Sequence, residues 1–353
     1  MNLKIDEELF KDLWPYIIDD NVTDIKWNGS NLWINDLKQG RYLVKDLKLD
    51  ETWLKIFTNR IANAVNVNFN YSNPSLKAET KELRIQAQHP SVSSDNSIAL
   101  AIRKTPCVSR LANQDLVKAS YLDVLTSHLL PCLMRSRLSG VIIGDVGSGK
   151  TELEKYLVGF IPEVDGIVSV EDTLELHLKD LYPNKDIYEM RISDNFKSED
   201  AIKDALRLMT KWLILSEARG EEIKEVMEAA STGCVALTSI HAENVWEIPD
   251  RILNMAKEDV HHGFENDVYT FFDYAIKVKA EITNQGIKRS IDQICFFDRT
   301  NKTNNITLYM VDGELLGNHI PKRILYKFSQ NNEQEFLSKY RVVMQAVEAR
   351  QEE

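Results

Sequence analysis

The chain has 353 residues, 43% of them hydrophobic, and a formal net charge of −11 at pH 7. This length exceeds what one hydrophobic core usually holds, so the sequence predicts two domains. The acidic balance and the lack of a lysine or arginine cluster argue against dedicated nucleic-acid binding, because neutralising phosphates requires a basic face.

No stretch approaches the roughly eighteen consecutive apolar residues of a membrane-spanning helix, and the N-terminal residues include acids and no hydrophobic signal region. We therefore expect a cytoplasmic protein without a transmembrane segment. The four cysteines are scattered and form no Cys-x-x-Cys pair, which favours reduced core thiols over disulfides or zinc ligands. They are Cys107, Cys132, Cys234 and Cys295.

Residues 1–105 are predicted to form a compact α+β domain. Apolar residues recur at helical spacing in 7–18 and 52–65, which predicts two helices packed on a larger body. A polar loop is expected at 70–76. Short alternating runs predict strands at 25–28, 32–35, 42–45, 83–88 and 98–103. No catalytic constellation stands out among these residues, so we expect this domain to serve in binding, closure or assembly.

Residues 106–120 form a mixed polar stretch that we predict to be a linker. A helix is expected at 122–134, and strands and helices then alternate, which predicts a mainly parallel sheet covered by helices over 121–325. A charged helix from about residue 333 lies in a predicted C-terminal helical segment, 326–353. The predicted strands are 166–170, 187–192, 212–215, 235–240, 274–279, 291–297 and 306–311, and the predicted helices 198–209, 221–230 and 245–255.

The stretch 141–151 has the pattern of a phosphate-binding P-loop. An apolar run suited to a buried strand leads into a glycine-rich turn, and Lys150 and Thr151 then open a helix-forming segment, which is the context that this motif requires. Lys150 would reach the β and γ phosphates, and Thr151 would ligate Mg²⁺. We expect ATP and Mg²⁺ as cofactors. The predicted nucleotide contacts are Gly144, Asp145, Val146, Gly147, Ser148, Gly149, Lys150, Thr151 and Glu152.

Two acidic segments follow predicted strands, and the carboxyl ends of such strands form the ligand side of a parallel sheet. A carboxylate in 171–175 could polarise the attacking water, although a solvated acidic turn explains this segment equally well. Residues 216–222 follow an apolar strand in the form of a Walker B segment, in which Glu217 would hold Mg²⁺ through water. The other explanation for Glu217 is an acidic residue at a helix start.

Three further residues are candidates by position alone. His241 ends the strand after the Walker B segment, where a γ-phosphate sensor would lie, or else it caps the next helix. Arg84 and Arg103 lie on the last two predicted strands of the N-terminal domain. Without other context, arginines on strands form surface ion pairs.

Together these segments resemble the secretion ATPase superfamily, the hexameric motors of type II and type IV secretion, pilus assembly and conjugation. The resemblance covers 24–311 and rests on the order of four boxes. They are Walker A at 144–151, an aspartate box at 171–175, Walker B at 216–222 and a histidine box at 232–241. The resemblance implies an α/β protein in which a smaller α+β N-terminal domain precedes a RecA-like P-loop NTPase domain.

The same resemblance assigns roles to single residues. Glu175 falls at the catalytic base, Glu217 at the Walker B glutamate, and His241 at the end of the histidine box. Arg84 and Arg103 match the arginines that reach the γ-phosphate when the N-terminal domain closes. It also implies a homohexamer at the inner face of the cell membrane, working with an inner-membrane platform or a secretion complex.

Several positions depart from that family's pattern. Glu152 replaces a threonine, Ser216 a glycine and Cys234 a histidine, which predicts slow catalysis. Residues 210–211 are Thr-Lys where the family usually has Pro-Asp. The short N-terminal domain resembles the conjugation and tight-adherence branch. Two alternatives remain at this point, a RecA-like nucleic-acid translocase and a nucleotide-binding scaffold with little turnover.

Overall fold

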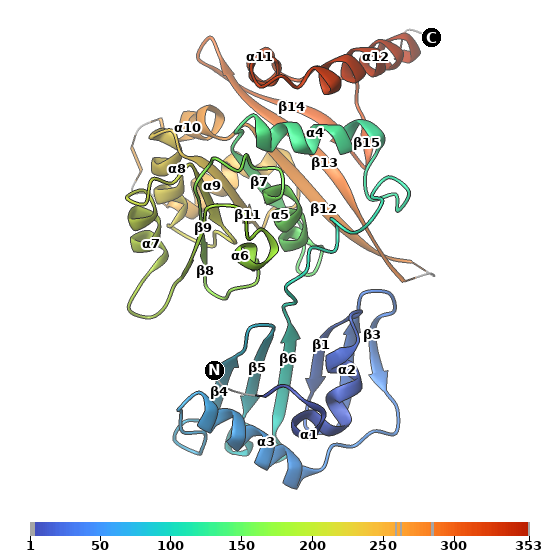
Figure 1. Ribbon diagram of the computed structural model, residues 1–353, viewed down its shortest axis with the longest axis vertical. Helices are drawn as coiled ribbons and strands as arrows, with labels where there is room; N and C mark the ends of the chain where they lie inside the picture. The colour runs from blue at the N-terminus through green and yellow to red at the C-terminus, as the bar shows by residue number, and fades with distance from the viewer. Residues whose placement is uncertain (1–3, 258–259, 262, 284–285, 352–353) are drawn as a thin grey trace. The chain divides into compact units, whose positions relative to one another are not determined.

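The computed structural model describes residues 4–257, 260–261, 263–283 and 286–351, and within it the chain forms two compact units (Figure 1). The first unit comprises the chain up to Cys107 together with Glu281–Lys288. The second comprises Val108–Ala280 and the chain from Arg289 onward. Within the described residues, no helix combines the length and the apolar character needed to cross a membrane.

The first unit is built on a six-stranded antiparallel sheet in the order β3-β2-β1-β6-β5-β4. Its strands are β1 (Val22–Trp27), β2 (Leu32–Asp36), β3 (Gly40–Val44), β4 (Ser75–Glu79), β5 (Leu83–Gln88) and β6 (Ala99–Lys104). Its helices are α1 (Glu7–Phe10), α2 (Trp14–Ile18) and α3 (Glu51–Ala64). Alternate strand residues are buried with the apolar side chains of these helices, so one face of the sheet carries the core.

Two predictions for this unit were wrong in detail. The single helix expected at 7–18 is interrupted by a 3-10 turn, Lys11–Leu13, and Lys11 has a positive φ of 44°, which an α-helix does not accommodate. The polar loop expected at 70–76 overlaps strand β4. Leu76 and Ala78 alternate with the polar residues of β4 and are buried, which is a short but regular strand pattern.

The second unit contains a nine-stranded sheet in the order β15-β14-β13-β12-β7-β11-β10-β8-β9. Neighbours from β12 to β9 are parallel, whereas β13, β14 and β15 pair antiparallel. The parallel strands are β7 (Gly140–Ile143), β8 (Ile167–Glu171), β9 (Ile187–Arg191), β10 (Trp212–Leu215), β11 (Val235–Ile240) and β12 (Tyr274–Thr283). The others are β13 (Gly286–Thr300), β14 (Thr303–Val311) and β15 (Glu314–Leu315).

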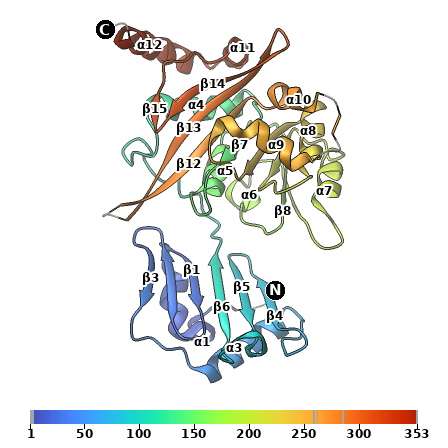
Figure 2. The same ribbon diagram turned by 180° about the vertical axis from the view of Figure 1, so that it is seen from behind.

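Helices cover both faces of this sheet, and each face has its own hydrophobic core (Figures 1 and 2). One core includes side chains of α4 (Val124–Arg135), α5 (Lys150–Val158), α6 (Leu178–Leu181), α11 (Lys322–Gln330) and α12 (Gln334–Gln351). The other includes side chains of α7 (Ser198–Ala205), α8 (Ile223–Ser231), α9 (Ile248–Ala256) and α10 (Phe264–Phe271). The sequence prediction contained no helix at α10, and its C-terminal helical segment, 326–353, covered only the end of α11.

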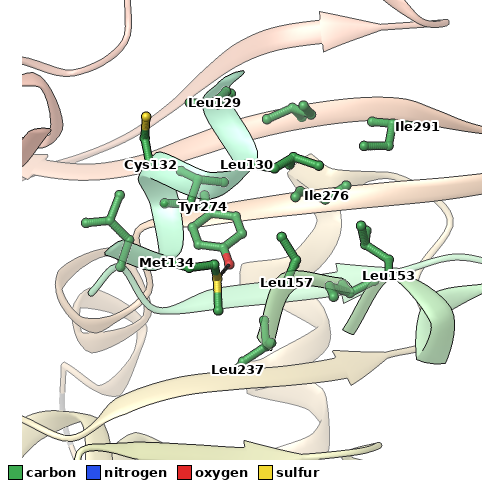
Figure 3. Packing of buried hydrophobic residues seen from close by; sticks show 14 of the residues in the cluster. Leu129, Leu130, Cys132, Met134, Leu153, Leu157, Leu237, Tyr274, Ile276 and Ile291 are labelled. Carbon is green, nitrogen blue, oxygen red and sulfur yellow. Dashed lines mark hydrogen bonds between the residues drawn. The ribbon is translucent and has the colours of Figure 1, made fainter. Parts of the chain in front are cut away.

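Figure 3 shows how tightly the first of these cores is packed. Tyr274 of β12 is fully buried, and its hydroxyl lies 3.5 Å from the sulfur of Met134 in α4. A side chain at Gly140 would clash with the Tyr274 ring, since a Cβ there would lie 2.2 Å from it. Full burial of a side chain such as Leu129 or Leu157 contributes about 2 kcal/mol, so this core fixes α4 and α5 on the sheet.

The strand order determines which loops meet at one edge of the sheet. β7, β11, β10 and β8 are consecutive neighbours and run parallel, so their carboxyl ends lie side by side. The P-loop, His241, Glu217 and the acidic turn after β8 follow those four ends in that order. This edge is where ligands of open α/β sheets bind.

Candidate nucleotide site

The P-loop joins β7 to α5 through residues whose backbone only glycine adopts easily. Gly144 has a φ of 147°, and a Cβ there would lie 2.3 Å from the carbonyl oxygen of Val278. Gly149 caps α5 in the left-handed region with a φ of 107°. The buried hydroxyl of Ser148 has no hydrogen-bond partner in the described part of the chain. A glycine-rich turn that opens a helix, with a spare hydroxyl, fits a phosphate group.

Lys150 folds back over the loop that it would share with a nucleotide. Its Nζ donates to the carbonyl oxygens of Gly144 at 2.7 Å and Asp145 at 3.3 Å. Burial lowers the pKa of Lys150, and the nearby carboxylates of Glu217, Glu154 and Asp145 oppose that shift. The ammonium group therefore lies among acids and carbonyls, and phosphate oxygens are the ligands that would compete for it.

Glu152 was predicted as a nucleotide contact, and its carboxylate has other partners in this structure. It accepts the backbone N–H of Arg110 at 2.9 Å and lies 3.3 Å from Nζ of the buried Lys155. The side chain of Arg289 approaches the loop from β13 and donates to the carbonyl of Gly147 at 3.3 Å. Neither Arg110 nor Arg289 was predicted from the sequence.

The acidic end of β10 forms one connected cluster with the end of β11. Nε2 of His241 lies 2.7 Å from one oxygen of Glu217, and Nη2 of Arg219 lies 2.6 Å from the other. Nη1 of Arg219 also contacts Asp172 at 2.9 Å. Asp172, Glu217, Arg219 and His241 are hereafter the Walker B cluster. The structure thus brings together two of the predicted site residues, Glu217 and His241.

Glu175 lies four residues beyond β8, in a turn that Glu171 organises. One carboxylate oxygen of Glu171 accepts the backbone N–H groups of Glu175 at 2.9 Å and Leu176 at 3.0 Å. Burial raises the pKa of Glu171 to about 7, against the effect of these two hydrogen bonds. Glu171 is thus a buried anchor of the turn, and Glu175 is the partly buried carboxylate of the segment.

Arg84 and Arg103 lie in the first unit and oppose one another on β5 and β6. Arg103 pairs with Asp24 of β1, and the two side chains lie 2.7 Å apart. Arg84 pairs in the same way with Glu79 of β4, at 3.9 Å. The four residues, hereafter the charged row, alternate with the buried residues of their strands and so lie on the face away from the core.

Two departures from the family pattern now have a structural description. Cys234 is buried under the start of β11, its sulfur faces the carbonyl of Lys211 at 3.5 Å, and burial raises its pKa to about 11. The hydroxyl of Ser239 donates to the carbonyl of Ser216 at 2.5 Å, which ties the end of β11 to the Walker B segment.

Arg219 is the main site residue that sequence reasoning missed. It lies inside the Walker B segment, two residues after Glu217, and its pKa is raised by hydrogen bonding to Glu217 despite partial burial. Asp172 was considered only as one of three acids in its turn. The available signal was a lone arginine within an acidic segment at the end of a buried strand.

Comparisons with known proteins identify the family of this chain. A family model described as "Type II/IV secretion system protein" matches residues 36–313. An uncharacterized protein of Bacillus anthracis is 27% identical over 316 residues, which are 82% of this chain and 70% of that protein. A putative conjugal transfer protein of Mycobacterium tuberculosis is 25% identical over 261 residues, 68% of this chain and 71% of that protein. The chain belongs to the type II/IV secretion system protein family.

A solved structure confirms the fold class. The ATPase DotB of Yersinia pseudotuberculosis superimposes with a TM-score of 0.64 at 14% sequence identity, covering 97% of this chain and 87% of that one. The predicted architecture, a smaller α+β N-terminal domain and a RecA-like α/β domain, is therefore correct.

Proposed function

We propose that this chain is an ATP-hydrolysing motor of a secretion, pilus or conjugation system. The observation that carries the proposal is the shared edge of the second sheet, where the P-loop lies beside the strand ends that bear His241 and Glu217. A P-loop alone binds nucleotide. A carboxylate, a histidine and an arginine next to it supply the groups that phosphoryl transfer to water requires.

Each residue has a role in the proposed reaction. The P-loop amides and Lys150 hold the phosphates, and Glu175 takes the proton from the attacking water. His241 and Arg219 orient Glu217 through their contacts with its two oxygens. Thr151 and Glu217 would hold Mg²⁺, which when bound neutralises phosphate charge.

Lys150→Ala tests the proposal most directly. Removing the ammonium group should weaken ATP binding at least about a hundredfold, because a charge that faces the β and γ phosphates is lost. Lys203→Ala is the matched control, since Lys203 is an exposed lysine that pairs with Glu225 in the same unit. Isothermal titration of both variants gives the affinities, and unchanged binding by Lys150→Ala would show that the P-loop assignment is wrong.

Assembly and location form a separate part of the proposal. We infer a homohexamer in the cytoplasm, attached through protein contacts to a membrane platform. The relatives' names, conjugal transfer protein and ATPase DotB, support this setting. Light scattering over a concentration series with a non-hydrolysable ATP analogue should show a mass of six chains. A monomer at every concentration would exclude the ring.

A nucleotide-binding scaffold is the second candidate function. It is favoured by Ser216 and Cys234, and by Glu217, whose two oxygens are already engaged by His241 and Arg219. Turnover decides between the two candidates. A motor hydrolyses ATP in a manner that depends on Glu175, whereas a scaffold binds it tightly and releases it unchanged.

A further inference from the structure

A polar cluster interrupts the hydrophobic core directly beneath the P-loop helix. The face of the sheet toward α5 carries Ile167, Val235 and Leu237, and Figure 3 shows Leu237 on the same side as Leu153 and Leu157 of α5. Because side chains alternate along a strand, the next residues on this face, toward the carboxyl ends, are polar. They are Ser169 and Glu171 of β8 and Ser239 of β11, and α5 adds Glu154.

The carboxyl groups of this cluster are removed from water. Glu154 is 0% exposed and Glu171 is 1% exposed. Neither carboxylate oxygen of Glu154 has a hydrogen-bond partner in the described part of the chain, and the same is true of Oε1 of Glu171 and the hydroxyl of Ser169. Ionising an unpaired carboxyl in such a place costs free energy, so burial shifts both groups toward the neutral acid.

The groups that face Glu154 come from each neighbouring element. Burial raises its pKa well above the ordinary value, and Glu171 of β8 and Glu217 after β10 raise it further. Lys150, one turn earlier on α5, lowers it. The nearby hydroxyl of Ser239 donates its hydrogen to the carbonyl of Ser216. Glu171 in turn faces Glu189 and Glu175, which raise its pKa.

Lys150 therefore links this cluster to the nucleotide site. While the site holds no phosphate, the ammonium charge of Lys150 favours the ionised form of Glu154. A polyphosphate brings several negative charges and takes Lys150 as its own counter-ion, so the electrostatic cost of an ionised carboxyl beneath the loop rises.

We propose that Glu154 and Glu171 form a buried carboxyl pair that takes up a proton from solvent when nucleotide binds at the P-loop. The charge of Glu171 acts on Glu154, so the titrations of the two groups are linked. Uptake keeps the space beneath the P-loop neutral while the phosphates are held, and release of the nucleotide returns the proton. The inference rests on the proposed nucleotide site and adds to it a linkage between ATP binding and pH.

The experiment is isothermal titration of the full chain with ADP in two buffers of different ionisation enthalpy, Pipes and Tris. The dependence of the observed enthalpy on the buffer gives the protons taken up per nucleotide. Between about pH 6.5 and 8, the parent should take up at least about half a proton more per bound ADP than variants without the pair. Glu154→Gln and Glu171→Gln should each lose most of this excess.

Glu225→Gln is the matched control, because Glu225 is a partly buried carboxyl on α8 that pairs with Lys203. It should keep the parent's uptake. The same titrations report affinity, so the absence of binding in the parent would refute the proposed function. Normal binding with equal proton uptake in the parent, Glu154→Gln and Glu171→Gln would overturn the pair alone, and loss confined to Glu171→Gln would remove Glu154 from it.

Discussion

The charged row of the first unit and the carboxyl cluster beneath the P-loop use similar side chains in opposite environments. Arg103 is 51% exposed and has Asp24 as its partner, whereas Glu154 and Glu171 are buried and keep unpaired oxygens. Charges in the row are screened by water and contribute little to stability. Charges in the cluster are not screened, so they determine pKa values and respond to any new charge nearby. The charged row is thus suited to direct contact with a ligand, whereas the buried carboxyls respond to the charge of a ligand without contacting it.

The largest effect is expected for Glu175→Gln, in the turn that the buried Glu171 holds. The amide preserves shape and cannot accept a proton, so turnover should fall about a thousandfold while ATP remains bound. Steady-state hydrolysis and nucleotide titration measure the two effects. If Glu175→Gln hydrolyses normally and Glu217→Gln does not, the base is Glu217.

Glu171→Gln tests what burial does to stability. The folded pKa of Glu171 is raised from 4.5 to about 7, so its stabilising effect is present in full below about pH 4.5 and is lost as pH rises through about 7. The loss amounts to about 3 kcal/mol. The amide oxygen still accepts the two backbone N–H groups but does not titrate. The free energy of unfolding of the variant should therefore lack this loss of about 3 kcal/mol as pH rises. Urea unfolding at about pH 5 and pH 8.5 measures this, and parallel stabilities of parent and variant would contradict it.

Arg103→Ala tests the exposed side. The resemblance to the secretion ATPases implies that Arg103 reaches the γ-phosphate, so we expect turnover to fall about a hundredfold with nearly unchanged ATP binding. The free energy of unfolding should change by less than about 1 kcal/mol, since an exposed ion pair contributes little. Arg41→Ala is the control, as Arg41 lies on β3 of the same sheet and stacks on Trp33 instead. If Arg103→Ala hydrolyses ATP at the parental rate, the first unit is an adaptor and takes no part in hydrolysis.

Asp24→Asn should have the smallest effect. It removes the ion pair of Arg103 with Asp24, so turnover should rise by no more than about fivefold, the equivalent of one exposed ion pair. Hydrolysis assays at low and high salt measure the gain, which should vanish when salt screens the pair. A loss of turnover would show that Asp24 itself takes part in the reaction.

The sequence predicted those parts of the molecule where local pattern and burial agree. The strands at Leu83–Gln88, Trp212–Leu215 and Val235–Ile240 match the structure residue for residue, because each is an apolar or alternating run between polar turns. β4 was missed because its two buried residues are flanked by polar and charged residues. Its strand structure is evident only from its pairing with β5.

The candidate site was predictable where it follows strand ends and unpredictable where it depends on contacts across the sheet. Glu217 and His241 were found from position, and their direct contact follows from the neighbouring places of β10 and β11. The roles of Arg219 and Glu154 depend on side-chain direction and burial, which periodicity does not give. Glu154 did carry one signal, an acid directly after Leu153 and four residues before Val158, both of which α5 buries.

The grouping of Glu281–Lys288 with the first unit has a consequence for synthesis on the ribosome. The main part of the first unit ends at Cys107, and its remaining segment, Glu281–Lys288, is synthesised about 175 residues later. At ribosomal rates of about 5–20 residues per second, the N-terminal sheet waits roughly 10–35 seconds for that segment. During this interval Val108–Ala280, the larger part of the second unit, is synthesised, so the first unit is completed late although it begins the chain.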